Sequence, residues 1–324
     1  MTAKPKVAIT WLGACGGCDE AIVDLNEALL DVAAAIEIVF WPVALDFKYD
    51  NVRAFKDSEI ALSIITGCVR NSEHAEVAEL LRRKSGIVLA FGACACFGGT
   101  SGLANFISKK EIFDYVYKDA PTVVNPNGVF PQTVTELDGK TLTLPEFYEH
   151  VYALNQVIPV DYYLPGCPPP PDLIATAVKA VLTGDLPPRG STLAPRRALC
   201  DTCPRNKKKP LRLEITKINR IHQIESDPDF CFLEQGILCM GSATRGGCGE
   251  TCVRNNIPCR GCFGPVPGVE DAGGRYLSAI ASILKTPETE DLRDLTATVM
   301  DPAGTFYRFG QAVSILGREK LAKP

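Results

Sequence analysis

Short apolar runs and amphipathic stretches alternate through the first half of this 324-residue chain. Apolar runs rich in β-branched residues predict five buried strands, at residues 7–12, 36–40, 60–65, 86–91 and 160–164. Helical spacing predicts three helices, at residues 19–32, 72–84 and 171–182, with Asn71 or Ser72 as the N-cap of the second. Asp138-Gly139 predicts a hairpin turn. Alternating strands and helices imply an α/β fold whose parallel sheet is covered on both faces.

The pattern changes after a linker signal formed by Pro187, Pro188, Gly190, Ser191 and Pro195. Beyond it the chain reads as short segments between cysteines. A chain of this length is expected to hold two domains. In the second, we expect metal ligation to replace a conventional apolar core.

Composition and charge narrow the class of protein. The 46% hydrophobic and 22% charged residues are typical of a soluble globular protein, and no apolar run approaches the roughly 20 residues that a membrane helix needs. A net charge of −4 argues against general binding to nucleic acid or to anionic membranes. Proteins and small molecules are therefore the expected partners.

Cysteine is the residue type that most strongly indicates chemistry, because the chain has 14 of them. Disulfides would require an oxidising compartment, usually reached through a signal peptide. The segment from Met1 to Trp11 shows neither an apolar signal core nor a twin-arginine pair, so a cytoplasmic, reducing environment is expected. In that environment the cysteines are expected to be metal ligands.

Four cysteines follow predicted strands. Cys15 and Cys18 come after the first strand, Cys94 after the strand at 86–91 and Cys167 after the last one. The carboxyl ends of parallel strands meet at one edge of the sheet, where ligands bind. Glycines near each position would let the backbone approach a bulky group. We interpret this set as a 4Fe-4S site; a redox CxxC pair at Cys15 and Cys18 is the alternative.

Two further cysteines in the first half have no fixed role. If the backbone stays extended after residue 91, Cys94 and Cys96 face the same side, and periodicity does not choose between them. Cys68 follows the strand at 60–65, so it could lie near the cluster. A buried packing residue is the simpler interpretation of Cys68.

Eight cysteines in the second half divide into two sets of four. Zinc favours compact paired knuckles, whereas here the two CxxC pairs are far apart with four other cysteines between them. Abundant glycine and the lack of nearby histidine favour iron-sulfur clusters, with two zinc sites as the alternative. These cysteines are Cys200, Cys203, Cys231, Cys239, Cys248, Cys252, Cys259 and Cys262.

Five ordered motifs resemble the small subunit of nickel-iron hydrogenases. They are WLGACGGCDE at 11–20, GACACFGG at 92–99, PGCPP at 165–169, CDTCP at 200–204 and PCRGC at 258–262. The resemblance spans about residues 7–265 and is closest to the cytoplasmic methyl-viologen-reducing, F420-non-reducing type that partners heterodisulfide reductase. It implies a flavodoxin-like domain at 1–185 holding a proximal cluster and a smaller irregular domain at 186–324 holding a medial and a distal one. It also favours Cys94 over Cys96.

The same resemblance assigns the remaining ligands. It places Cys200, Cys203, Cys231 and Cys239 on the distal cluster, and Cys248, Cys252, Cys259 and Cys262 on the medial one. Many periplasmic relatives have histidine at the position of Cys200 and a three-iron medial cluster. Cysteine at both positions here implies three 4Fe-4S clusters, and anionic thiolates in place of a neutral imidazole imply low potentials.

In this family the nickel-iron site lies in a separate large subunit, so the resemblance implies that this chain lacks it and conducts electrons to an acceptor. That acceptor could be an iron-sulfur linker to heterodisulfide reductase. Glu20 matches an acidic position near the subunit interface and could assist proton movement, or it could be a solvated carboxylate at a helix start. A basic run at 205–209 could dock an acidic partner or form a solvated loop.

Two other functions fit some of these features. The 20 kDa-type subunit of quinone-reductase complexes shares the N-terminal cluster fold. It has adjacent cysteines in its first motif and lacks a cluster-rich second domain, whereas Gly16-Gly17 separate Cys15 from Cys18 here. A non-enzymatic iron-sulfur or zinc protein is the second alternative.

Overall fold

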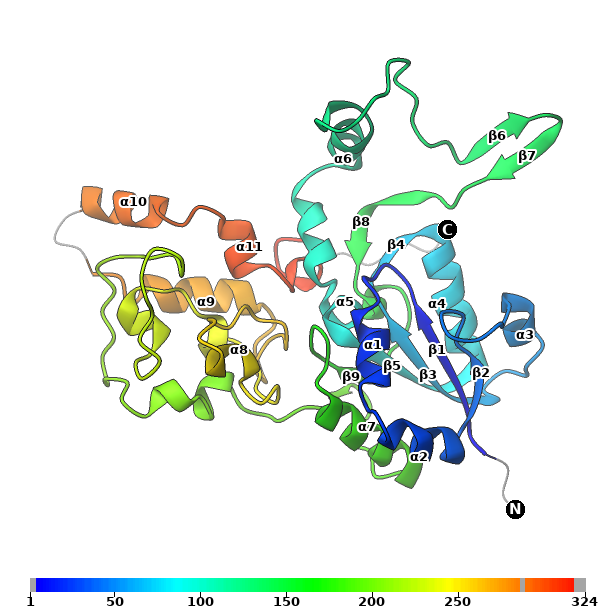
Figure 1. The fold of residues 1–324 in the computed structure, drawn as a ribbon, viewed down its shortest axis with the longest axis horizontal. Coiled ribbons are helices and arrows are strands. Elements are labelled where there is room, and N and C mark those ends of the chain that lie inside the picture. Colours follow the sequence, from blue (N-terminus) through cyan, green and yellow to red (C-terminus); the bar gives the residue numbers. More distant parts are fainter. Residues whose placement is uncertain (1–3, 286–288, 318–324) are drawn as a thin grey trace.

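A six-stranded parallel sheet is the centre of the first half of the protein (Figure 1). The computed structural model describes residues 4–285 and 289–317, so 1–3 and 318–324, at the ends of the two expected domains, lie outside the described residues. The strands are β1 (Lys6–Trp11), β2 (Glu37–Phe40), β3 (Ile60–Thr66), β5 (Ser85–Phe91), β9 (Tyr162–Leu164) and β10 (Ser191–Thr192). From one edge of the sheet to the other, the strands lie in the order β2-β1-β3-β5-β9-β10, which is flavodoxin-like. The α/β prediction is confirmed.

Successive side chains along the strands enter two apolar cores, one on each face of the sheet. On β1, Ala8 packs with α3 (Tyr49–Arg53) and α4 (Ser72–Lys84), while Val7 and Ile9 pack with α1 (Gly17–Val23) and α7 (Pro171–Thr183). Both faces are thus covered, as predicted. The Asn71 side chain accepts the His74 N–H at 2.8 Å and caps α4, which also confirms that N-cap.

The helix predicted at 19–32 is wrong in one respect, because the segment forms two helices. Helix α1 ends at Val23, and α2 (Ala28–Ala35) begins after a turn in which Asn26 has a φ of 52°. Asparagine tolerates this left-handed conformation better than most residues, so it can end a helix without a glycine. The break lets the chain bend while Leu25 and Leu29 both contact the same core.

Several strands lie where the sequence pattern gives no strand signal. The strand β10 lies within the predicted linker and pairs with β9, so Ser191 belongs to the sheet. An antiparallel ribbon joins β4 (Val69–Asn71) to β8 (Phe147–Tyr152).

The predicted hairpin is confirmed: Asp138 and Gly139, with φ of 51° and 72°, connect β6 (Val134–Leu137) to β7 (Lys140–Thr143). With α6 (Lys109–Asp114), this hairpin projects from the body of the protein (Figure 1).

The second half has an apolar core of its own, contrary to the expectation that metal ligation replaces one. Ile218, Leu233, Met240, Tyr276 and Phe306 are buried together beside the cysteine-bearing loops. The described part of this half contains the helices α8 (Thr251–Arg254), α9 (Ala272–Ala281), α10 (Thr289–Ala297) and α11 (Pro302–Phe306).

The end of the described chain returns to the first half. The Gln156 Nε2 donates to the backbone oxygen of Ala312 at 2.9 Å. Within the described ranges, none of the helices combines the length and the apolar character needed to span a membrane.

Candidate iron-sulfur sites

The four cysteines predicted for the proximal cluster come together at the carboxyl edge of the sheet. Cys15 lies in the loop after β1, Cys18 in the first turn of α1, Cys94 in α5 (Gly92–Phe97) and Cys167 after β9. Burial raises the pKa of Cys18, and the neighbouring Cys94, Cys167 and Cys15 raise it further in that order. The Ala93 N–H donates to the Gly166 oxygen at 2.6 Å, which ties two of the cysteine loops together.

Two glycines leave space beside these sulfurs that any other residue would fill. A Cβ at Gly92 would lie 2.3 Å from the Cys18 Sγ, and one at Gly99 would lie 2.4 Å from the Cys94 Sγ. Both glycines also have positive φ, of 85° and 59°. The backbone can therefore approach the sulfurs closely, as a bulky cluster with N–H donors to its sulfurs would require.

Helix α5 distinguishes Cys94 from Cys96. The premise of an extended backbone after residue 91 is wrong, because these residues are helical and the two side chains point in different directions. Cys96 is buried, and its thiol donates to the Ala90 oxygen at 3.3 Å. Cys94 is half-buried, and burial with the charges of Cys68, Cys167 and Cys15 raises its pKa to about 12. The geometry therefore favours Cys94.

Cys68 packs against the loop that carries Cys15. It is 1% exposed, and its thiol donates to the Gly13 oxygen at 3.1 Å. The backbones of Gly13 and Cys68 exchange two hydrogen bonds, at 2.8 and 3.0 Å. This contact holds the end of β1 beside the end of β3.

The cysteines predicted for the distal cluster also neighbour one another. Burial, then the charges of Cys239, Cys231 and Cys203, raises the pKa of Cys200 to about 12, while Lys209 lowers it. The pKa of Cys239 is raised to about 11 by burial, with smaller contributions from Cys231 and Cys203.

The predicted medial set lies between the other two. Burial raises the pKa of Cys262 to about 12, and Cys248, Cys167 and Cys252 raise it further. Cys167 belongs to the predicted proximal set, so the two sets adjoin there. On the other side, the Cys259 N–H donates to the Sγ of Cys239 at 3.3 Å, which joins the predicted medial and distal sets.

No group of three or more His, Cys, Asp or Glu side chains in the described ranges is close enough to hold a single metal ion. The thiolates of a 4Fe-4S cluster bind different irons, so they stand around the cluster and do not converge on one point. The separated thiols are compatible with that arrangement.

Two buried charged groups were not recognised in the sequence. Asp19 is buried next to Cys18 and accepts the Trp41 Nε1–H at 2.9 Å, while the neighbouring Glu20 is exposed in the first turn of α1. Arg205 is 2% exposed, stacks 3.9 Å from the Phe232 ring centroid and has an unpaired Nε. Asp19 directly follows the predicted ligand Cys18, and this adjacency is the signal that could have identified it in the sequence.

The structure leaves fewer basic side chains available for docking at 205–209 than the sequence suggested. Arg205 is inside the protein, and it donates to the backbone oxygens of Asp227 at 2.7 Å and Phe230 at 2.9 Å. Lys208 forms an ion pair with Asp229 at 2.7 Å. The exposed basic residues of this loop are therefore Lys207 and Lys208, and the second of them already has a carboxylate partner.

A flavodoxin-like sheet with thiols gathered at its carboxyl edge, followed by a cysteine-rich second half, is the plan of a hydrogenase small subunit. Residues 15–181 match the family described as NADH ubiquinone oxidoreductase, 20 Kd subunit. A chain of the NiFeSe hydrogenase from Desulfovibrio vulgaris Hildenborough shares the fold, with a TM-score of 0.50 and 18% identity, over 83% of this chain and 96% of that one.

Relatives of known type define the family more closely. The iron-sulfur subunit of the F420-non-reducing hydrogenase of Archaeoglobus profundus is 44% identical over 289 residues, 88% of this chain and 90% of that one. The corresponding subunit of the F420-non-reducing hydrogenase of Methanothermobacter thermautotrophicus is 39% identical over 95% of each chain. The chain belongs to this family of F420-non-reducing hydrogenase iron-sulfur subunits, which confirms the resemblance predicted from its motifs.

Proposed function

We propose that this chain carries electrons between a nickel-iron site in a separate large subunit and an acceptor protein, by means of three 4Fe-4S clusters. Family membership supports the role in electron transfer and the oxidoreductase class. The number of clusters, their ligands and the acceptor are the finer parts of the proposal.

The continuous series of thiols is the observation on which the proposal rests most. The series begins at the carboxyl edge of the sheet, passes from Cys167 to Cys262, and continues from Cys259 to Cys239. Each predicted set thus adjoins the next, as a path for successive electron transfers requires. A zinc protein would have no need for such an order.

Twelve cysteines would hold the clusters, each of which, when bound, accepts and releases single electrons. The glycines beside Cys18, Cys94 and Cys200 leave room for the group, since a Cβ at Gly241 would lie 3.2 Å from the Cys200 Sγ. Proximal ligands would be Cys15, Cys18, Cys94 and Cys167; medial ligands Cys248, Cys252, Cys259 and Cys262; and distal ligands Cys200, Cys203, Cys231 and Cys239.

The chain's own contribution is to hold and shield the groups. The buried rings of Phe232 and Phe263 and the surrounding apolar clusters lower water access to the outer sets. Lys209 adds positive charge near Cys200 and Cys231, which favours their thiolate forms. Glu20 is exposed on α1 next to the proximal set, where a partner subunit could contact it.

The proposal also covers the domain boundaries, the acceptor protein and the cellular location. We assign the sheet region, about 1–185, to the proximal cluster and 186–324 to the other two. The acceptor would be an iron-sulfur protein linked to heterodisulfide reductase, and the complex would work in the cytoplasm.

The test separates this chain from its partner. The chain is produced anaerobically alone and together with the large subunit, and iron, nickel and hydrogen-driven viologen reduction are measured. We expect iron in both preparations, but nickel and activity only in the second. Nickel bound stoichiometrically by the chain alone, or zinc in place of iron, would contradict the proposal.

A further inference from the structure

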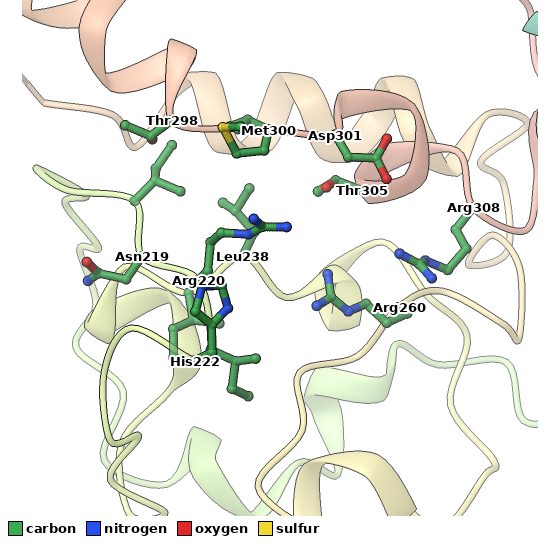
Figure 2. A pocket seen from close by; sticks show the side chains of 14 residues that line it. Asn219, Arg220, His222, Leu238, Arg260, Thr298, Met300, Asp301, Thr305 and Arg308 are labelled. Atoms are coloured by element: carbon green, nitrogen blue, oxygen red, sulfur yellow. The ribbon is translucent and has the colours of Figure 1, made fainter. Parts of the chain in front are cut away.

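Three arginines from separate segments line one pocket in the second half of the protein (Figure 2). Arg220 lies in the loop before η6 (Phe232–Gln235), Arg260 in the loop after α8, and Arg308 just after α11. Their guanidinium groups are turned toward the same space (Figure 2). The pocket has a volume of about 180 Å³, enough for one or two acidic side chains but not for a large cofactor.

The described part of the chain offsets only part of the positive charge of this pocket. None of the three arginines has a described carboxylate within ion-pair distance. The one carboxylate in the lining, Asp301, accepts the Gly304 N–H at 2.8 Å and so caps α11. Three guanidinium groups in a concave site suit carboxylates or phosphates from another molecule.

Apolar side chains form about half of the remaining lining, beside polar ones such as Asn219 and Thr305, and this mixed lining favours a protein as that molecule. Leu238 and Met300 both line the pocket; Leu238 is buried, whereas Met300 is 71% exposed. Protein interfaces are enriched in arginine and methionine and depleted in lysine. No lysine is among the described residues that line this pocket. An acidic protein segment offers both carboxylates and apolar side chains, whereas free phosphate offers only oxygens.

The position of the pocket indicates which protein would bind. Leu238 precedes the predicted distal ligand Cys239, and Arg260 follows the predicted medial ligand Cys259. We infer that Arg220, Arg260 and Arg308 bind the carboxylates of an acidic segment of the electron-acceptor protein. This inference rests on the proposed electron-transfer function. It moves the docking surface from the basic run at 205–209 to this pocket.

Zero-length cross-linking tests the inference. Arg220→Lys and Arg308→Lys each keep the positive charge and introduce an amine that a carbodiimide joins only to a carboxylate in direct contact. The variants are made in the full complex that retains its acceptor protein. Arg275→Lys, exposed on α9 and outside the pocket lining, is the matched control. Cross-linked peptides are identified by mass spectrometry.

We expect positions 220 and 308 to join to aspartate or glutamate of the acceptor, and position 275 not to do so. High salt should abolish these cross-links, because exposed charge pairs are screened. Cross-links only within this chain or to the large subunit, or none while the acceptor is present, would overturn the inference. So would their loss on adding millimolar phosphate with the acceptor still bound, because the pocket would then be a phosphate site.

Iron content and hydrogen-driven viologen reduction of the unmodified complex separate the two proposals. A complex that contains iron and reduces viologen, but gives no cross-link, refutes the docking site and leaves the electron-transfer function standing. A complex without iron refutes that function.

Discussion

Single cysteines in this protein sit where a free thiolate would be unfavourable. Burial and the neighbouring thiols raise the pKa values of Cys94, Cys200 and Cys262 to about 12, so without iron these groups are protonated at neutral pH. Metal ligation requires the thiolate, so a bound cationic cluster would have to compensate for this cost. Cysteine ligands can therefore be distinguished from cysteines with other roles by the effect of replacing each one.

Cys18→Ala and Cys68→Ala should have different effects, although both residues follow strands. Cys18 is assigned to the first cluster on the electron path, so its loss should reduce hydrogen-driven dye reduction to background and lower the iron content by about four per chain, one 4Fe-4S cluster. Cys68 fills space beside Gly13, and its truncation should destabilise the fold by about 1 kcal/mol. Activity per intact complex should survive in Cys68→Ala. An equal loss in both variants, at equal iron content, would assign Cys68 a role near the proximal cluster.

Cys200→His should raise the reduction potential of one cluster without preventing its assembly. A neutral imidazole would replace an anionic thiolate. The cluster would then carry less negative charge, which favours its reduced state. Replacement of two cysteines by histidines in Rieske centres raises potentials by several hundred mV, so a rise on the order of 100 mV is expected for one. An anaerobic redox titration followed by electron paramagnetic resonance measures it. Unchanged potentials would show that Cys200 is not a ligand.

Secondary-structure elements position the predicted cysteine ligands, and in some places this positioning requires a glycine beside the sulfur. Gly92→Ala should lower the iron content, because the new Cβ would lie 2.3 Å from the Cys18 Sγ in a backbone with φ of 85°. Gly139→Ala is the matched control, since φ is 72° there and no atom lies within 4 Å. Both variants carry backbone strain of about 1–3 kcal/mol. Equal iron content in the two would show that the space beside Cys18 does not serve the cluster.

One buried carboxylate holds three elements of the sheet layer together. Asp161, before β9, accepts from Arg82 on α4 at 2.5 Å and from the Val88 N–H on β5 at 2.8 Å, and it also pairs with Arg189. Burial raises the pKa of Asp161, but the hydrogen bonds from Arg82 and Val88 and the charges of Arg82 and Arg189 outweigh it, so the pKa is lowered. Its stabilising contribution is therefore present above about pH 4 and is lost as the pH falls below that value.

Asp161→Asn should accordingly destabilise the protein by about 3 kcal/mol at pH 7, because it leaves two arginines without their charge partner. The exposed Asp185→Asn is the control. Anaerobic thermal unfolding at pH 7 and near pH 3 measures the effect, and the difference between variant and wild type should shrink at the lower pH. A difference that is independent of pH would indicate that the charge of Asp161 is not what stabilises the fold.

At this scale, the sequence predicts strongly periodic elements well and irregular ones poorly. Long buried strands and the capped helix α4 have local signals, and the motifs identify the family. Strand β10 has only two residues and is held by its pairing with β9, so nothing local marks it. The break at Asn26 leaves the apolar spacing intact and is invisible to periodicity. Buried groups such as Arg205 depend on contacts with residues distant in the chain, which no single-sequence pattern contains.

At the scale of the whole molecule, two differently built halves meet through their cysteine loops. The first positions thiols by the topology of a parallel sheet, and the second by irregular loops around a separate apolar core. Cys167 and Cys262 adjoin where the halves meet, so the proposed electron path would cross from one half to the other there. The hydrogen bond from Gln156 to the backbone of Ala312 is one of the contacts that hold the two halves together.

The anaerobically prepared chain should therefore contain about twelve irons and twelve sulfides, as three 4Fe-4S clusters, each with four thiolates. Cys252 decides the medial count, because a set without it would have three thiolates and would suit a three-iron cluster. Iron and sulfide analysis with electron paramagnetic resonance of the oxidised protein measures this. Cys252→Ala should convert one cluster to a three-iron form with a signal in the oxidised state, and wild type should lack that signal. A stoichiometric three-iron signal in freshly prepared wild type would contradict the assignment of Cys252, while leaving the proximal set untouched.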